Sequence, residues 1–179
     1  MRLIMSKSEE NCSLKGSLMR LAATAKSHDL RVLTTELPEV EGIGRRLYTV
    51  SELTRLSGMT RKQAVYWSHI SLLTPALQVP EARGKNPAYF YSSEEALRAL
   101  IFCELKRCGF SLQQIKQVAR NLHRDRLQLE RAGTYLLTDG YSVYYADSDH
   151  EVVDILRHHR QLLLLVPIQE QVRKLGEAA

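Results

Sequence analysis

The stretch from Tyr48 to Tyr91, YTVSELTRLSGMTRKQAVYWSHISLLTPALQVPEARGKNPAYFY, decides the fold. Its first half predicts two short helices with almost no chain between them, which must therefore cross at a steep angle. A basic loop with two prolines and a glycine follows, and the aromatic run that ends the stretch favours a strand. This order of elements predicts a winged helix-turn-helix, a fold in which the second helix binds DNA.

Four helix starts carry the same signal, a Ser or Thr followed three residues later by Glu or Gln. In such a pair the hydroxyl and the second side chain satisfy each other's backbone N–H groups. The pairs are Thr49–Glu52, Thr60–Gln63, Ser92–Glu95 and Ser111–Gln114. We expect the first helix to end at Gly58, the second by Pro75 and the third at Gly109, because Gly and Pro are common stop signals.

The second helix presents two different faces. Ala64 and Trp67 are expected to face inward, together with Ile70 or Ser71. The residues that are then expected to point outward are Arg61, Lys62, Val65, His69 and part of Tyr66. Residues Gln78 to Pro87 are expected to be a loop carrying Arg83 and Lys85, and Tyr89 to Tyr91 a strand. Loop and strand together would form the wing.

The charge distribution supports a polyanionic partner for this region. Residues 45 to 126 hold 14 Lys or Arg against 6 Asp or Glu, although the net charge of the chain is only +5. Residues 1 to 44 hold 6 of each, and residues 127 to 179 hold 5 Lys or Arg against 8 Asp or Glu. The positive excess therefore coincides with the helix-turn-helix pattern, where it would attract DNA.

The remaining chain suggests an α+β protein in three parts. We expect residues 1–46 to be a partly disordered leader, 47–126 the DNA-binding domain, and 127–179 a small β-rich domain. The hairpin signal Asp139-Gly140 predicts a small antiparallel meander over residues 130 to 168, and residues 169 to 175 are expected to be a short helix. We expect this last part to make a homodimer; effector binding and partner recruitment are the alternatives.

Other functional classes find little support in the sequence. No apolar run is long enough to span a membrane, and the absence of a secretory signal predicts a cytoplasmic protein. Cys12, Cys103 and Cys108 are expected to be free thiols. Because no nucleophile–base pair, phosphate loop or metal-ligand spacing occurs, we expect neither an enzyme nor a cofactor. The pair His158-His159 is assigned no function.

Residues Leu47 to Leu122 resemble the MerR-type winged helix-turn-helix regulators. The matching segments are Tyr48-Thr-Val-Ser-Glu-Leu, Gly58-Met-Thr, Tyr66-Trp67, Leu72-Leu73-x-Pro75, Arg83-Gly84, Tyr89-Phe90-Tyr91 and Gly109-Phe110-Ser111-Leu112-x-x-Ile115. The chain departs from the family pattern in three places. Val65 and Tyr89 stand where the family usually has Arg, and the apolar spacing ends at Leu122 where the family continues into a long dimerisation helix.

The resemblance implies that the second helix enters the major groove and that the wing lies on the flanking backbone. The DNA-binding residues so implied are Thr60, Arg61, Lys62, Tyr66, Trp67, His69, Arg83, Lys85 and Tyr89, although Trp67 is more typical of a core anchor. The implied function is a sequence-specific, DNA-binding transcriptional regulator. Its partners would be double-stranded DNA and a second copy of the chain, with RNA polymerase as a further possible partner. The alternative is a protein-interaction or architectural module that keeps the winged fold.

Overall fold

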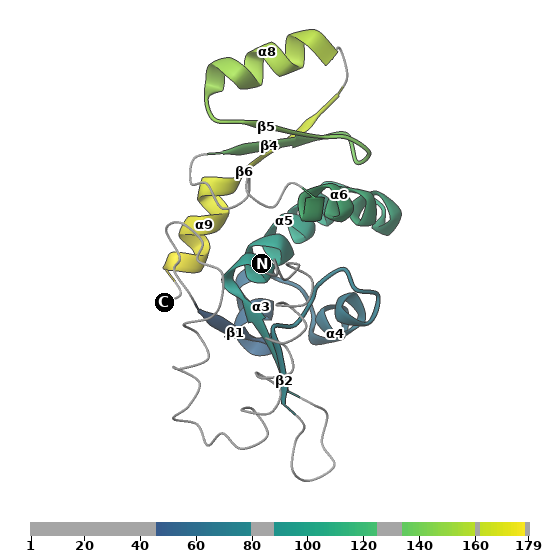
Figure 1. Ribbon diagram of the computed structural model, residues 1–179, viewed down its shortest axis with the longest axis vertical. Helices are drawn as coiled ribbons and strands as arrows, with labels where there is room; N and C mark the ends of the chain where they lie inside the picture. Colours follow the sequence, from purple (N-terminus) through teal and green to yellow (C-terminus); the bar gives the residue numbers. More distant parts are fainter. Residues whose placement is uncertain (1–45, 80–87, 125–133, 160–161, 178–179) are drawn as a thin grey trace, which may run out of the picture.

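The computed structural model describes residues 46–79, 88–124, 134–159 and 162–177. These residues form an α+β structure with six helices and two small antiparallel sheets (Figure 1). The first part comprises β1 (Leu47–Thr49), α3 (Val50–Ser57), α4 (Arg61–His69), β2 (Leu77–Val79), β3 (Ala88–Ser92), α5 (Ser93–Arg107) and α6 (Leu112–Arg124). The second part comprises β4 (Tyr135–Thr138), β5 (Val143–Ala146), α8 (Asp149–His159), β6 (Leu164–Pro167) and α9 (Ile168–Gly176).

The four predicted helix starts are confirmed, and the predicted reciprocal pair forms at two of them, before α3 and before α6. At α3 the Glu52 N–H donates to Thr49 Oγ1 at 3.2 Å, and the Thr49 N–H donates to the Glu52 carboxylate at 2.8 Å. Ser111 and Gln114 make the same reciprocal pair before α6. At the starts of α4 and α5, the hydroxyls of Thr60 and Ser92 accept hydrogen bonds from the N–H groups of Gln63 and Glu95. Gly58 ends α3 in the left-handed conformation with φ 73°, as predicted.

We expect Thr49→Ala to lower the free energy of unfolding by about 1 kcal/mol at pH 7, because it removes the cap of α3. Burial raises the pKa of Glu52, but hydrogen bonds from Thr49 and the charge of Arg46 outweigh it and hold that pKa below its usual 4.5. Ionised Glu52 therefore stabilises the fold above pH 4.5, and this contribution is lost as the pH falls through the lowered pKa.

Urea unfolding of both proteins at pH 7 and pH 3 measures this difference, which should shrink at the lower pH. Thr54→Ala is the matched control, because the Thr54 hydroxyl only donates to the Ser51 carbonyl within α3. That control should change stability by less than about 0.5 kcal/mol. Equal losses in the two variants would contradict a specific role for the cap.

The N-terminal sheet has the strand order β1-β3-β2, with Tyr48 opposite Tyr91 and Gln78 opposite Tyr89. The predicted strand at Tyr89–Tyr91 is confirmed. The prediction that Gln78 to Pro87 is a loop throughout was wrong, because Gln78 belongs to strand β2 (Leu77–Val79). Strands of three residues leave almost no periodic signal, and their pairing with β3 is what defines them. The rest of the predicted loop, with Arg83 and Lys85, lies outside the described residues.

Helix α4 ends at His69, well before the predicted stop at Pro75. The chain leaves the helix at Ser71, which has a left-handed φ of 56°. The N–H groups of Leu72 and Leu73 then turn back to the Trp67 carbonyl, at 2.8 and 3.2 Å. This turn brings both leucines into the core, where their exposed fractions are 2% and 0%.

The C-terminal sheet has the order β5-β4-β6. Thr138 of β4 pairs with Val143 of β5, which confirms the predicted hairpin at Asp139-Gly140. Gly140 has φ 93°, and a Cβ there would lie 2.9 Å from the Phe110 ring, so this turn packs closely against the start of α6. The meander prediction was wrong over residues 149–159, which form α8. A further capping pair, in which the Glu151 N–H donates to Ser148 Oγ at 3.3 Å, starts this helix.

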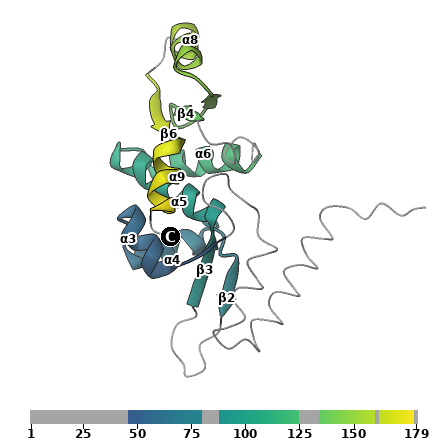
Figure 2. The same ribbon diagram turned by 90° about the vertical axis from the view of Figure 1, so that its left-hand side faces the viewer.

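One hydrophobic core joins elements from both parts of the chain. The predicted C-terminal helix is α9, which packs along α5 and contributes Ile168, Val172 and Leu175 to this core (Figures 1 and 2). Leu136 of β4 and Val166 of β6 belong to the same cluster. The predicted leader (apart from Arg46) and the predicted boundary at residue 126 lie outside the described residues. Within the described ranges, no helix is long and apolar enough to cross a membrane.

Candidate nucleic-acid interface

Helix α4 is fixed to the core by Trp67, whose side chain is only 1% exposed. Its ring meets the Phe102 ring edge-on, with the ring centroids 6.3 Å apart and an interplanar angle of 74°. The ammonium group of Lys106 lies 5.9 Å from the Trp67 ring centroid, within the range of a cation–π contact. Both contacts come from α5. Trp67 therefore supports α4 from beneath and lies away from the surface on which DNA could be bound.

A second set of contacts joins α4 to the N-terminal sheet. Ser68 Oγ lies 2.7 Å from the hydroxyl of Tyr91 on β3, and it also donates to the Ala64 carbonyl at 3.0 Å. Burial raises the pKa of Tyr91, so its hydroxyl stays protonated at neutral pH. After α4, the Thr74 N–H donates to the Glu95 carboxylate at 2.8 Å, which ties the returning chain to α5. Helix α4, strand β3 and helix α5 thus form one packed unit.

The opposite face of α4 is open to solvent and carries the predicted polar groups. Arg61, Lys62 and His69 are exposed, and Tyr66 keeps 49% of its surface. Thr60 is also exposed, but its hydroxyl already accepts from the Gln63 N–H. Within the described ranges, neither Arg61 nor Lys62 forms an ion pair with a carboxylate. Both charges are therefore available to an external anion.

The other predicted site residues are less well placed. Tyr89 is half-buried and packs against the core, so only part of it could reach a ligand. Val65, which stands where the resembled family has Arg, is half-buried beside the exposed Tyr66. Arg83 and Lys85 lie outside the described residues. The helix face thus gathers Arg61, Lys62, Tyr66 and His69 from the sequence-predicted set.

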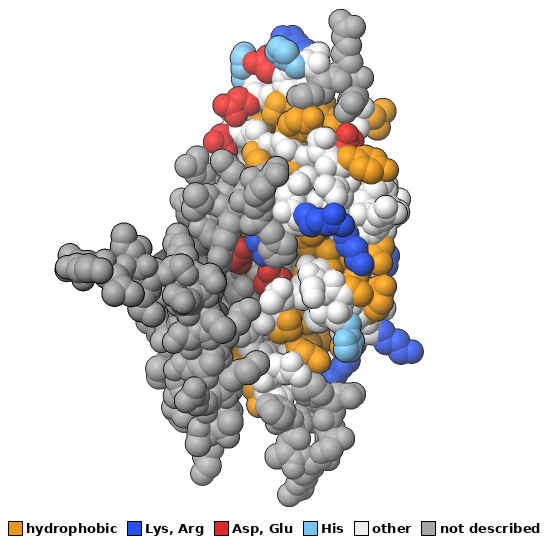
Figure 3. Space-filling model, turned by 45° about the vertical axis from the view of Figure 1, so that its right-hand side comes forward, with side chains coloured by type: hydrophobic (Ala, Val, Ile, Leu, Met, Phe, Trp, Pro, Cys, Tyr) orange, Lys and Arg blue, Asp and Glu red, His pale blue; other side chains and the backbone are white. Residues whose placement is uncertain are grey.

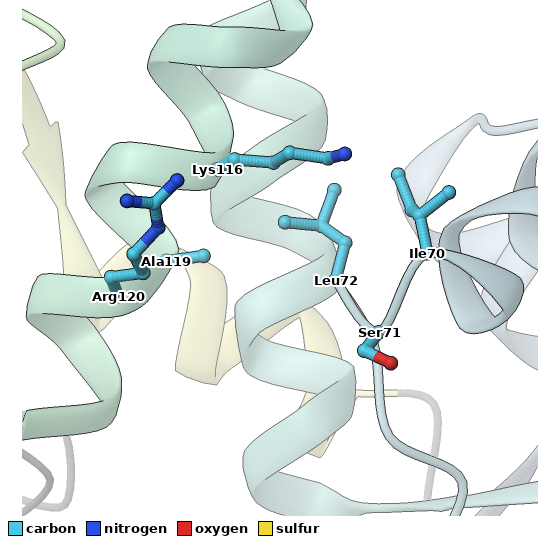
Figure 4. Close-up of a pocket in the computed structure, with 6 residues that line it drawn as sticks. All are labelled: Ile70, Ser71, Leu72, Lys116, Ala119 and Arg120. Carbon is cyan, nitrogen blue, oxygen red and sulfur yellow. The ribbon is translucent and has the colours of Figure 1, made fainter.

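Two further basic residues lie beside the end of α4, on helix α6. Lys116 and Arg120 border a hollow of about 230 Å³ whose opposite wall is the turn that follows α4 (Figure 4). In Figure 4 the Lys116 side chain extends towards Leu72, the Arg120 guanidinium turns to the same side, and the Ser71 hydroxyl points away. No described carboxylate pairs with either cation. The hollow is therefore lined by two available positive charges over an apolar floor that includes Leu72 and Ala119.

Sequence reasoning did not single out Lys116 and Arg120, which border this hollow. A signal was present, because the two lie four residues apart on the polar side of a predicted helix. What the spacing could not show is that this side of α6 meets the turn after α4. That proximity depends on how α6 and α4 both pack against α5.

Basic side chains are also present on the wider surface. Figure 3 shows several separate groups of Lys and Arg side chains on one face, with Asp and Glu side chains both near the upper end and at mid-height beside a basic group. Among the described residues, no three His, Cys, Asp or Glu side chains are grouped so as to hold a metal ion. Cys103 is buried and Cys108 exposed, and both are free thiols, whereas Cys12 lies outside the described residues.

Comparison with known proteins agrees with this geometry. Residues 48–122 match the family described as MerR HTH family regulatory protein. The chain is 32% identical over 103 residues to an uncharacterized HTH-type transcriptional regulator of Mycobacterium tuberculosis, covering 58% of this chain and 44% of that protein. It is 31% identical over 108 residues to the HTH-type transcriptional regulator CueR of Bacillus subtilis, covering 60% and 65%. The chain thus spans less than half the length of the mycobacterial relative.

Proposed function

We propose that this chain is a sequence-specific DNA-binding transcriptional regulator and not an enzyme, because residues 48–122 match the family described as MerR HTH family regulatory protein. The observation that carries the proposal is the exposed start of α4, where Arg61 and Lys62 lie beside each other without a described carboxylate partner. A helix so held by the buried Trp67 can enter the major groove with little loss of conformational entropy.

The residues of α4 divide into two roles in this proposal. Arg61 and Lys62 lie in the first turn, the part of a groove-entering helix that meets base edges and nearby phosphates. Arg can donate two hydrogen bonds to the O6 and N7 atoms of guanine, and Lys neutralises a phosphate. Tyr66 and His69, further along the exposed side, are suited to the sugar-phosphate backbone. Tyr89, Arg83 and Lys85 are proposed to extend these backbone contacts through the wing.

The hollow between α6 and the end of α4 is proposed to take a further backbone phosphate. Its two cations come from α6, so they would contact DNA outside the groove that α4 occupies. Each neutralised phosphate releases counterions, which strengthens binding most at low salt. The contact would carry no base preference and would fix the orientation of α4 in the groove.

Selection of bound duplexes from a random pool tests the proposed function. The full chain should enrich a common sequence, and anisotropy with that sequence should show affinity that falls as salt rises. Enrichment of no sequence, together with no salt-dependent binding to any duplex, would refute DNA binding. One stoichiometric protein partner retained from nuclease-treated cell extract would then favour the alternative, a protein-interaction module.

We expect Lys116→Gln/Arg120→Gln to weaken binding by a similar factor on the selected and on a scrambled duplex. The slope of log K against log salt should flatten by about 0.9 for each phosphate contact that is lost. The matched control is Gln113→Ala/Gln117→Ala on the same helix, which leaves the charge unchanged and should leave the slope unchanged. A variant with altered sequence preference, or with the slope of the unmodified protein, would contradict a phosphate contact in the hollow.

A further inference from the structure

The β4–β5 turn (residues 139–142) contacts α6 at two places. At the start of the helix, a Cβ on the buried Gly140 would lie 2.8 Å from Nε2 of Gln114 and 2.9 Å from the Phe110 ring, so only a glycine fits without a shift. Near the end of the helix, Asn121 Nδ2 donates to the Tyr141 carbonyl at 3.1 Å. Figure 1 shows the tip of the hairpin beside α6. The turn therefore contacts α6 near both ends of the helix.

The β4–β5 turn is held in one shape by its own hydrogen bonds. The Asp139 carboxylate accepts from the Tyr141 and Ser142 N–H groups, at 2.8 and 2.7 Å. Thr138 Oγ1 accepts from the Gly140 N–H at 2.9 Å and donates to the Ser142 carbonyl at 2.6 Å. Burial raises the pKa of Asp139, but the N–H groups of Ser142 and Tyr141 outweigh it and hold that pKa below its usual 3.8. The turn thus presents a fixed surface to α6.

The contacts with the turn and the two cations of the hollow lie on different sides of α6. Gln114 and Asn121 are seven residues apart, which places them within about 20° of each other around the helix axis. Lys116 follows Gln114 by two residues and therefore lies about 200° around the axis from it. Arg120 lies on the same side as Lys116, four residues further along. A rotation of α6 about its axis would therefore move both cations relative to the turn that follows α4.

The rest of α6 is attached to the protein through one apolar side. The buried residues of the helix all belong to the main hydrophobic core; they are Ile115, Val118, Ala119 and Leu122. Apolar contacts are not directional, so this side alone leaves small rotations of the helix possible. A close steric contact at Gly140 and a hydrogen bond at Asn121, both on another side, remove that freedom. In Figure 4, Lys116 and Arg120 extend from α6 into the hollow.

We propose that the β4–β5 turn sets the rotation of α6 and so holds Lys116 and Arg120 in the geometry that a backbone phosphate requires. Gly140 and Asn121 are positioning residues in this proposal, and they act on the phosphate only through the two cations. This positioning role rests on the proposed function, because the phosphate is that of the bound duplex. It gives the C-terminal sheet a part in DNA binding without any contact between that sheet and DNA.

Hydrogen exchange of the full chain without DNA tests the contact itself. Asn121→Ala should raise exchange of the α6 N–H groups by about threefold or more, because it removes one hydrogen bond that holds the helix, while α3 serves as the internal reference. Gly140→Ala should act in the same direction, since its methyl group would meet Phe110 and Gln114. Gly58→Ala is the matched control, because Gly58 is also left-handed but has nothing within 4 Å of an added Cβ. It should leave exchange in α6 unchanged.

Salt dependence of binding to the selected duplex tests the consequence. Neither Asn121→Ala nor Gly140→Ala changes the charge, so a role in packing alone predicts an unchanged slope of log K against log salt. If the turn positions the cations, each folded variant should weaken binding and flatten the slope, by up to about 0.9 for each phosphate contact that is lost. Gln113→Ala, at an exposed position on the same helix, is the control and should bind normally.

A combined variant separates positioning from an independent effect. Adding Asn121→Ala to Lys116→Gln/Arg120→Gln should cause little further loss, because the cations that it positions are already gone. An additive loss, or a folded Asn121→Ala protein with the slope and the α6 exchange of the unmodified protein, would overturn the proposal. If Gly140→Ala does not fold, Asn121→Ala decides alone. An unmodified chain that binds no duplex would refute the proposed function, and hydrogen exchange would then still decide whether the turn holds α6.

Discussion

Replacing Trp67 with Ala is expected to lower the free energy of unfolding by about 3 to 5 kcal/mol. The side chain is 1% exposed, and its removal leaves a cavity between α4 and α5 bounded by the Phe102 ring. It also removes the contact with the Lys106 ammonium group. Because whole domains are stable by only about 5 to 15 kcal/mol, a large fraction of the variant should be unfolded at modest urea concentrations. Urea unfolding followed by circular dichroism measures the change.

The neighbouring aromatic residue provides the contrast. Tyr66 keeps 49% of its surface, so Tyr66→Ala should change stability by less than about 1 kcal/mol while weakening DNA binding. Trp67→Phe keeps a ring in the core and should lose only about 1 to 2 kcal/mol, with DNA affinity close to that of the unmodified protein. If folded Trp67→Phe lost DNA affinity as strongly as Tyr66→Ala, Trp67 would have to reach DNA itself.

Replacing both Arg61 and Lys62 with Gln is expected to weaken binding to the selected duplex by about 10- to 100-fold near 0.1 M salt. The two side chains are the exposed cations of the first turn of α4, so the groove loses a base contact, a phosphate contact or both. The single variants separate these roles. Lys62→Gln should weaken all sequences alike and flatten the salt slope by about 0.9, whereas Arg61→Gln should reduce the preference for the selected sequence.

The control for this pair removes equal charge far from α4. Arg173→Gln/Lys174→Gln acts on α9, which packs on the other side of the molecule (Figure 1). If DNA binding depended only on the total positive charge, the α9 double variant would lose as much DNA affinity as the α4 double variant. If Arg61 and Lys62 contact DNA directly, the α9 double variant should bind DNA almost normally, and only the α4 double variant should lose affinity. Similar losses in the two double variants would contradict the proposed role of Arg61 and Lys62.

The sequence by itself determined the local structure around the candidate site. Short-range hydrogen bonds, such as those between Thr49 and Glu52, form within one helical turn, so residue spacing is enough to predict them. Gly58 was predictable for the same reason, because the left-handed conformation it adopts depends on one residue. The inward position of Trp67 and the exposure of Arg61 and Lys62 followed from helical spacing alone.

Only the tertiary structure decided what no short segment specifies. Strands β1 and β2 have three residues each and are defined by pairing with β3, and α4 ends early because Leu72 and Leu73 must reach the core. Lys116 and Arg120 border the candidate interface because α6 and α4 both pack on α5. Contacts between distant residues depend on the packing of whole elements, and that packing also determines which side of α8 remains exposed.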